Sequence, residues 1–230
     1  MNNAKPLQSA SFALLLAGVA VAAPGLARAG STEAHWYAGA MGGFASQSDQ
    51  SLAFTSGANR ENGNLPLDTG SLLGARIGRS FGNGWRLEGE FAYQGMDTKG
   101  PEFPPRAPPS QAPVGSGDYA STAFALNALY DLNLTGSDKA ETYVGLGVVR
   151  LTEVDLDIGS GSAGRNYSGS GNGLQALFGA RYSLDDAWTL DVGLRYLRAT
   201  DLSLDQENGA GRIRADYTPW AVTIGIDRRF

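Results

Sequence analysis

The chain has no cysteine and only one histidine, His35, among its 230 residues. The lack of cysteine excludes a disulfide framework and thiol chemistry. Basic residues are also few, since 18 lysines and arginines face 23 aspartates and glutamates for a net charge of −5. An acidic chain of this kind lacks the excess of positive charge that is typical of proteins that bind nucleic acid. The composition predicts no metal site, no cofactor and no nucleic-acid partner.

The amino-terminal 29 residues have the pattern of a cleaved secretory signal peptide. A positive start precedes an apolar stretch at 11–23, and Ala27-Arg28-Ala29 fits the small-x-small cleavage rule, so the mature chain is expected to begin at Gly30. The alternative is a transmembrane anchor. The apolar stretch is shorter than the roughly 20 residues that a span needs, and Pro24 interrupts its end.

Beyond residue 29, no stretch is apolar enough for a transmembrane helix. Large apolar residues instead alternate with small or charged ones, which predicts strands with two different faces. We expect eight such strands, at 35–46, 68–81, 85–96, 119–132, 141–158, 174–184, 188–204 and in a closing segment that ends at Phe230. A membrane protein without spanning helices must be a closed barrel, because lipid cannot satisfy an open sheet edge.

The connections between these segments alternate in length. Short turns follow the second, fourth and sixth segments, whereas long polar stretches occupy 47–66, 97–117, 159–173 and 205–211. Outer-membrane barrels have short periplasmic turns and long exterior loops. Aromatic residues flank the short turns, as an interfacial girdle requires: Phe81, Trp85, Tyr130, Tyr182, Trp188 and Phe230. The sequence therefore predicts an all-β fold, an eight-stranded antiparallel transmembrane up-and-down β-barrel over residues 30–230.

A soluble antiparallel barrel or sandwich also alternates, but its charged face looks toward water and needs no aromatic belt at the strand ends. Three motifs favour the membrane barrel, namely Trp36-Tyr37-Ala38-Gly39, Tyr143-Val144-Gly145-Leu146-Gly147 and the final strand ending at Phe230. With these motifs the chain resembles the eight-stranded outer-membrane β-barrel superfamily, which includes the outer-membrane protein A barrel, the opacity and attachment-invasion proteins and the "porin family" barrels.

The resemblance covers about residues 35–230 and implies an integral outer-membrane protein of a Gram-negative bacterium. It implies lipopolysaccharide and outer-membrane lipid as surroundings, the outer-membrane assembly machinery as a partner, and Phe230 as the carboxy-terminal assembly signal. It leaves no room for the periplasmic peptidoglycan-binding domain that follows the outer-membrane protein A barrel. The superfamily is functionally mixed, so the motifs specify architecture better than function.

The strand faces predicted to point inward carry charges of both signs. They are Arg76, Arg86, Glu88, Glu90, Asp131, Arg181, Asp191, Arg195, Asp227 and Arg229. Eight strands leave an interior only just wide enough for side chains, and buried charges must pair. We therefore expect a structural charge network that plugs the lumen. The alternative is a narrow, gated polar pathway for small solutes, as in a porin-like channel.

Catalysis is not expected. Eight-stranded lipid A deacylases use a histidine and a serine, but His35 opens the first strand at the periplasmic end, far from the outer leaflet. The predicted exterior loops are acidic, which favours solvated surfaces over heparin-like partners, while Arg150, Arg198 and Arg214 lie where they can meet lipid phosphates. The expected role is structural or surface-interactive, such as envelope integrity or adhesion through host or surface ligands. A soluble ligand-binding barrel is the other alternative.

Overall fold

The computed structural model describes residues 33–104, 112–132, 134, 136–137, 139–159 and 164–230. The expected signal peptide, residues 1–29, lies outside this part. All eleven regular elements of the described residues are strands in one sheet. In the same residues, no helix has the length and hydropathy needed to cross a membrane.

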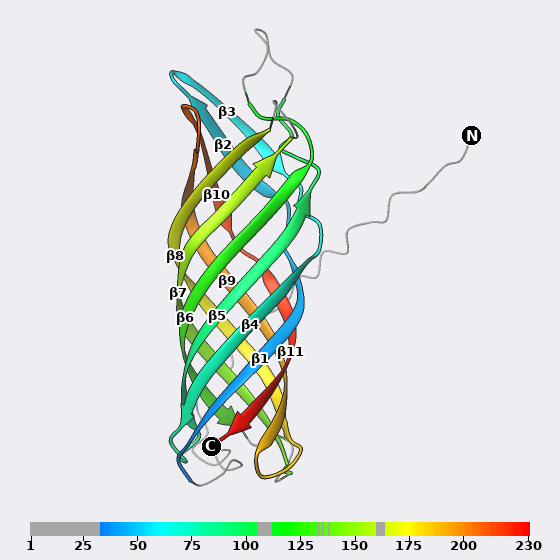
Figure 1. Cartoon of the computed structure of the whole chain (residues 1–230), viewed down its shortest axis with the longest axis vertical. Helices are drawn as coiled ribbons and strands as arrows, with labels where there is room; N and C mark the ends of the chain where they lie inside the picture. Colours follow the sequence, from blue (N-terminus) through cyan, green and yellow to red (C-terminus); the bar gives the residue numbers. More distant parts are fainter. Residues whose placement is uncertain (1–32, 105–111, 133, 135, 138, 160–163) are drawn as a thin grey trace, which may run out of the picture.

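Eight of the strands form a closed antiparallel ring (Figure 1). They are β1 (His35–Ser46), β4 (Gly70–Ser80), β5 (Trp85–Thr98), β6 (Gly117–Leu132), β7 (Ala140–Ile158), β8 (Arg165–Ser183), β9 (Trp188–Gln206) and β11 (Trp220–Arg229). Strand β11 closes the ring because it pairs with β1 on one side and with β9 on the other. The predicted eight-stranded barrel is confirmed.

Short turns lie at the lower end of the barrel in the orientation of Figure 1, near the carboxy-terminal residue. In the turn between β4 and β5, the Phe81 N–H donates to the Trp85 carbonyl at 3.0 Å. Gly82 and Gly84 there have φ angles of 72° and 89°, which glycine adopts without steric cost. The turn between β8 and β9 closes similarly, with Leu184 N–H donating to the Trp188 carbonyl at 2.9 Å.

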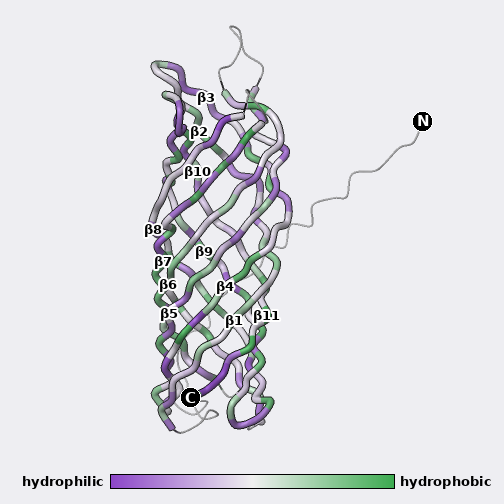
Figure 2. Tube along the Cα trace, in the orientation of Figure 1, coloured by the Kyte–Doolittle hydropathy of each residue, from purple (hydrophilic) through white to green (hydrophobic). Residues whose placement is uncertain are grey.

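The outward faces of the lower half are apolar. Exposed aromatic and aliphatic side chains alternate along each strand, as on β5, where Trp85, Leu87, Phe91 and Tyr93 are all exposed. In Figure 2, hydrophobic residues are frequent along the strands of the lower half, whereas the β2–β3 hairpin at the upper end is largely hydrophilic. For a strand tilted by about 40°, the segment from Trp85 to Tyr93 rises about 20 Å, close to the roughly 25 Å apolar band of outer-membrane barrels.

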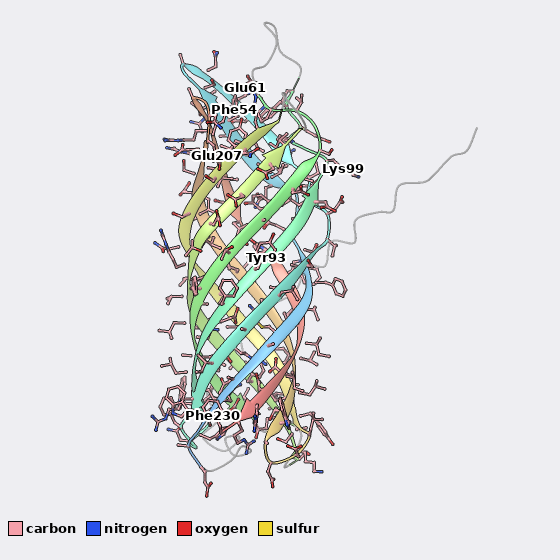
Figure 3. All side chains as sticks on the ribbon, in the orientation of Figure 1. Phe54, Glu61, Tyr93, Lys99, Glu207 and Phe230 are labelled. Carbon is pink, nitrogen blue, oxygen red and sulfur yellow. The ribbon has the colours of Figure 1, made fainter. Side chains whose placement is uncertain are left out.

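Figure 3 shows Phe230 at the lower end, Tyr93 near mid-height, and Phe54 and Glu61 near the upper end. The barrel therefore continues far above its apolar belt. We call this upper part the upper wall: the portions of β5 to β9 above Tyr93, Ala123, Leu151, Gly173 and Ala199, together with β2 (Gln50–Ser56), β3 (Asn59–Leu65) and β10 (Gly211–Tyr217).

The upper wall corrects the prediction that the long connections are loops. Residues 47–66 contain the hairpin β2–β3, residues 165–173 belong to β8, and the closing segment is preceded by the separate strand β10. Strand β10 pairs with β9 and β2, and β2 pairs with β3. Isolated bridges from Asn64 to Glu102 and from Leu67 to Thr98 join this hairpin to the end of β5. Backbone pairing thus continues around the barrel above the membrane belt.

The upper wall is apolar inside and polar outside, the reverse of the lower half. Its interior is a large cluster of buried residues to which Phe54, Leu151, Leu156, Leu204 and Ile213 belong, none of them more than 1% exposed. On β7, the inward positions are odd-numbered up to Leu151 and even-numbered from Val154. The ladder irregularity between these two residues produces this change of phase.

Candidate functional site

The structure places nine of the ten predicted inward charges inside the barrel, each no more than 7% exposed. Arg229 is half-buried at the lower mouth. Because these charged side chains come from β4, β5, β6, β8, β9 and β11, they meet only when the ring closes. We call this group, with the polar side chains that bind it, the lumen network.

Arg76 occupies the centre of the lumen network. Its Nε and Nη2 donate to the two carboxylate oxygens of Asp227 at 2.8 and 2.9 Å, and its Nη1 donates to Asp191 at 3.3 Å. The Glu88 carboxylate lies 3.9 Å from Nε. The paired guanidinium and carboxylate make the fork-like geometry that gives the strongest hydrogen bonds of this type. Arg76 therefore compensates three buried carboxylates at once.

Arg86 forms a second pair nearer the lower mouth. Its Nε donates to the Asp131 carboxylate at 2.9 Å, and its Nη1 donates to the Tyr37 hydroxyl at 3.1 Å. The guanidinium carbon also lies 4.9 Å from the centre of the Tyr143 ring, which is within the range of a cation–π contact. Arg181 reaches the same region, with Nη1 4.0 Å from Glu141.

Glu90 and Arg195 close the upper side of the lumen network. They form a buried ion pair across the barrel, and a second Arg195 nitrogen donates to the other Glu90 oxygen at 3.1 Å. Amide side chains fill the remaining space: Gln175 donates to Asn127 at 2.6 Å, and Asn127 donates to Glu88 and Glu90 at 3.4 Å. The charged groups on this side of the network are therefore paired with each other or hydrogen-bonded to amides.

Tyr37, Tyr143, Asn127 and Gln175 are parts of the network that the sequence analysis did not select. The ring of Tyr37 lies against Gly78, and the ring of Tyr143 lies against Gly179. A Cβ added at Gly78 would be 2.3 Å from the Tyr37 ring, and one added at Gly179 would be 2.5 Å from the Tyr143 ring. The glycines thus make room for the two rings. The sequence did indicate the inward position of Tyr143 through the alternation of the strand, because Tyr143 lies two residues before Gly145 and four before Gly147.

The lumen is filled above the network as well. A cavity of only about 30 Å³ lies between Glu90 and Arg195 below and Leu151 and Tyr217 above. Beyond it, the Tyr217 hydroxyl accepts from Gln94 at 2.8 Å and bonds Ser121 at 2.7 Å. The apolar interior of the upper wall follows. The lumen network and this apolar core thus follow one another along the barrel axis.

His35 lies where the sequence placed it, at the lower start of β1. Its Nδ1 is 3.0 Å from the Glu33 carbonyl, and the strand register sets Ser80 opposite it. In the described part of the chain, no hydrogen bond joins His35 to a serine, and no group of three or more metal-ligating side chains is assembled. Phe230 is exposed at the same end, and its backbone exchanges two hydrogen bonds with Trp36 at 2.9 and 3.1 Å.

The outer face of the upper wall carries acidic side chains in rows. Asp97, Asp118 and Asp157 are direct cross-strand neighbours on β5, β6 and β7. The pKa of the neighbouring Asp155 carboxyl is raised by partial burial and by the charges of Glu153, Asp157 and Glu207. Like charges directly opposite each other destabilise a sheet by about 0.2–1 kcal/mol per pair. Asp97 was predicted to lie in a long loop but belongs to β5, whereas Asp155 and Asp157 lie within the segment 141–158 that was predicted to be a strand.

Neutralising the middle of this row should stabilise the upper wall. The variant Asp118→Asn removes repulsion with Asp97 and Asp157 together, so amide protection in β6 and β7 is expected to rise by a few tenths to about 1 kcal/mol in hydrogen exchange. Asp186→Asn, in the β8–β9 turn, is the matched control and should change nothing. Lower protection in the Asp118 variant would contradict the assignment of repulsion to this row.

Lowering the pH should stabilise the upper wall, as the Asp118→Asn substitution does. Because the pKa of Asp155 is raised in the folded state, that state binds more protons than the unfolded state at pH values just above the ordinary aspartate pKa. The contribution of Asp155 to the free energy of unfolding therefore increases as the pH falls through its raised pKa. Hydrogen exchange of the β7 amides, corrected for the intrinsic rate, measures this at pH 7 and pH 5.

Comparisons with known proteins agree with this architecture. A search of curated proteins finds no match. Among solved structures, Neisserial surface protein A aligns with a TM-score of 0.50 at 16% identity, covering 86% of this chain and 99% of that one. The outer membrane protein AlkL, solved in lipid bilayers, aligns with a TM-score of 0.51 at 19% identity, covering 100% and 97%.

The attachment invasion locus protein of Yersinia pestis aligns with a TM-score of 0.40 at 16% identity, over 85% of this chain and 99% of that one. A family model described as the outer membrane protein beta-barrel domain matches residues 11–230, which is nearly the whole chain. The closed eight-stranded ring and the apolar belt of this chain agree with that description. The chain belongs to the family of outer-membrane β-barrel proteins and resides in the outer membrane.

Proposed function

We propose that this protein is a closed barrel with a structural or surface-interaction role in the outer membrane, and neither a channel nor an enzyme. The filled lumen carries this proposal. The cavity between the lumen network and the apolar core has a volume of about 30 Å³, which is room for about two water molecules. Such packing leaves little space for solutes larger than water.

The upper wall supports the second part of the proposal. The short turns assign the lower end to the periplasm, so the upper wall projects outward from the cell. On its outer face, β2, β3, β10 and the segment Glu102–Pro104 border a hollow of about 820 Å³. The small residues Ser51 and Ala53 are part of its lining. Most of the other lining side chains are polar or charged and include Arg60, Asn62, Asn64, Arg214 and Asp216.

A hollow of this size is within the range of ligand sites, and its position exposes it to molecules outside the cell. We propose it as the contact surface for a polar ligand of the host or of a neighbouring cell. Phe103, at one edge, packs edge-on against Phe54 with ring centres 6.3 Å apart. This contact ties the rim of the hollow to the core of the upper wall. Phe230 and the outer-membrane assembly machinery remain proposed partners in barrel insertion.

Planar-bilayer conductance tests the closed lumen. The mature protein, inserted in a bilayer, is expected to give no discrete conductance steps, because paired charges and packed apolar residues occupy the axis. A heat-modifiable gel shift of the same preparation controls for correct folding. Reproducible steps that change in size in the Glu90→Gln variant would show that the network lines a pathway, and the porin-like alternative would replace this proposal.

A further inference from the structure

A groove of about 610 Å³ lies on the outside of the barrel at the upper edge of the apolar belt. Strands β6, β7 and β8 form it. Its apolar border consists of the exposed side chains Phe124, Leu126, Val148 and Leu174, each between 52% and 66% exposed. Its polar end is formed by Arg150 and Asn172. The groove therefore has one end suited to a hydrocarbon chain and one suited to a charged group.

Arg150 is held in place at the polar end. Its Nη1 donates to the Asn172 side chain at 3.2 Å, and its Nη2 donates to the Ser170 hydroxyl at 3.1 Å. Both partners are neutral, so the positive charge is oriented without being neutralised. Within the described residues, no carboxylate lies within ion-pair distance of Arg150, although Glu153 follows three positions further along β7.

A second arginine, Arg198 on β9, lies on the other side of β8 from Arg150, near the polar end of the groove. Arg198 is the register partner of Leu174, whereas Arg150 is the register partner of Asn172, two residues away on the same face of β8. Strands β7 and β9 are separated by two inter-strand spacings, about 9.5 Å. Between them, the outward face of β8 carries Ser170, Asn172 and Leu174, because the glycines at 169, 171 and 173 face the barrel interior. The two arginines thus flank the part of β8 that carries the two neutral hydrogen-bond partners of Arg150.

Exposed residues on several other strands are neutral, such as Phe44 on β1, Leu73 on β4, Tyr93 on β5 and Trp220 on β11. Along β7 to β9, in contrast, a phosphate at the surface of the outer leaflet meets two arginines. Arginine is suited to this role because its planar fork matches the oxygens of a phosphate.

We propose that this groove is a binding site for one phosphorylated lipid of the outer leaflet, of the lipid A type. One acyl chain lies along Leu126, Val148 and Leu174, and one phosphate lies between Arg150 and Arg198. The charge complementarity and the height of the two arginines at the belt edge identify the occupant. The site is independent of whether the lumen conducts, since it lies on the opposite face of the barrel wall.

Native mass spectrometry of the mature protein in detergent, titrated with diphosphoryl lipid A, tests the site. We expect one lipid A molecule to bind each protein more tightly than any further lipid A molecules do. Its apparent affinity should fall about tenfold in each of the variants Arg150→Ala and Arg198→Ala, which is the usual effect of losing a hydrogen bond to a charged group. Removing the phosphates from the lipid should weaken binding to the native protein by at least as much as these substitutions weaken the binding of diphosphoryl lipid A.

A second variant tests the acyl end without altering charge. Val148→Trp places an indole in the groove and should weaken the same adduct, whereas Ile77→Trp, on the lipid-facing surface of β4, should not. Arg212→Ala, in the upper wall, is the matched charge control. A heat-modifiable gel shift verifies the fold of each variant. Unchanged binding in both arginine variants, or equal binding of the phosphate-free lipid to the native protein, would overturn the proposal.

Discussion

Replacing Arg76 with methionine is expected to lower the free energy of unfolding by about 3–5 kcal/mol. Arg76 is the shared partner of Asp227, Asp191 and Glu88, and all three carboxylates are buried. Without the guanidinium, the three carboxylates face one another with no positive charge between them. The loss is therefore dominated by uncompensated carboxylate charge and only partly by lost hydrogen bonds.

Urea titration in detergent micelles, followed by tryptophan fluorescence and the heat-modifiable gel shift, measures this change. Arg212→Met is the control, because its ion pair with Asp205 is exposed on the upper wall and exposed ion pairs contribute little to stability. The double variant Arg76→Met with Asp227→Leu should regain part of the loss, since it removes one stranded charge. Equal small effects of Arg76→Met and Arg212→Met would show that the network is hydrated.

Replacing Phe54 with alanine is expected to destabilise the upper wall by about 3–5 kcal/mol while leaving the membrane belt folded. Phe54 is 1% exposed in the apolar interior, and its ring packs against Phe103. The substitution leaves a cavity where β2 covers the core. Because the lower half obtains its stability from lipid contact and from the lumen network, it does not depend on this ring.

Limited proteolysis of the protein in lipid vesicles separates the two halves. Protease added from outside should cut the Phe54→Ala variant within residues 50–65 at a much higher rate than the native protein, while the heat-modifiable shift stays intact. Thr55→Ala, the neighbouring position on β2, is the control and should keep native resistance. Simultaneous loss of the gel shift and of protease resistance would show that both halves unfold as one cooperative unit.

The lower half of the barrel was predictable from sequence because one rule governs all its strands. Lipid requires apolar outward positions, and the narrow lumen favours small or charged inward ones, so Trp85, Leu87 and Phe91 separate cleanly from Arg86 and Glu88. The pairing of these charges was not predictable. Arg76 and Asp227 are 151 residues apart, and only the closure of β11 on β1 determines which carboxylate meets which arginine.

The upper wall was missed for two physical reasons. The segment 47–66 is rich in polar residues because its outward face meets water, so it has the composition of a loop although it forms the hairpin β2–β3. On β7 and β9, one extra residue changes the inward phase, near Glu153 on the first and at Asp201 on the second, whose φ is 56°. Strict alternation cannot follow a strand through a bulge.

The reversed polarity of the upper wall has a consequence for the order of folding. The lower half can bury its apolar surface by entering lipid. The upper wall buries its own only when β10 joins β2, a contact between residues about 160 positions apart along the chain. Contacts of such sequence separation form late. Until then, Leu151, Leu156 and Leu204 lie on an uncovered apolar sheet face, so the unclosed chain is prone to aggregation until its last strands arrive.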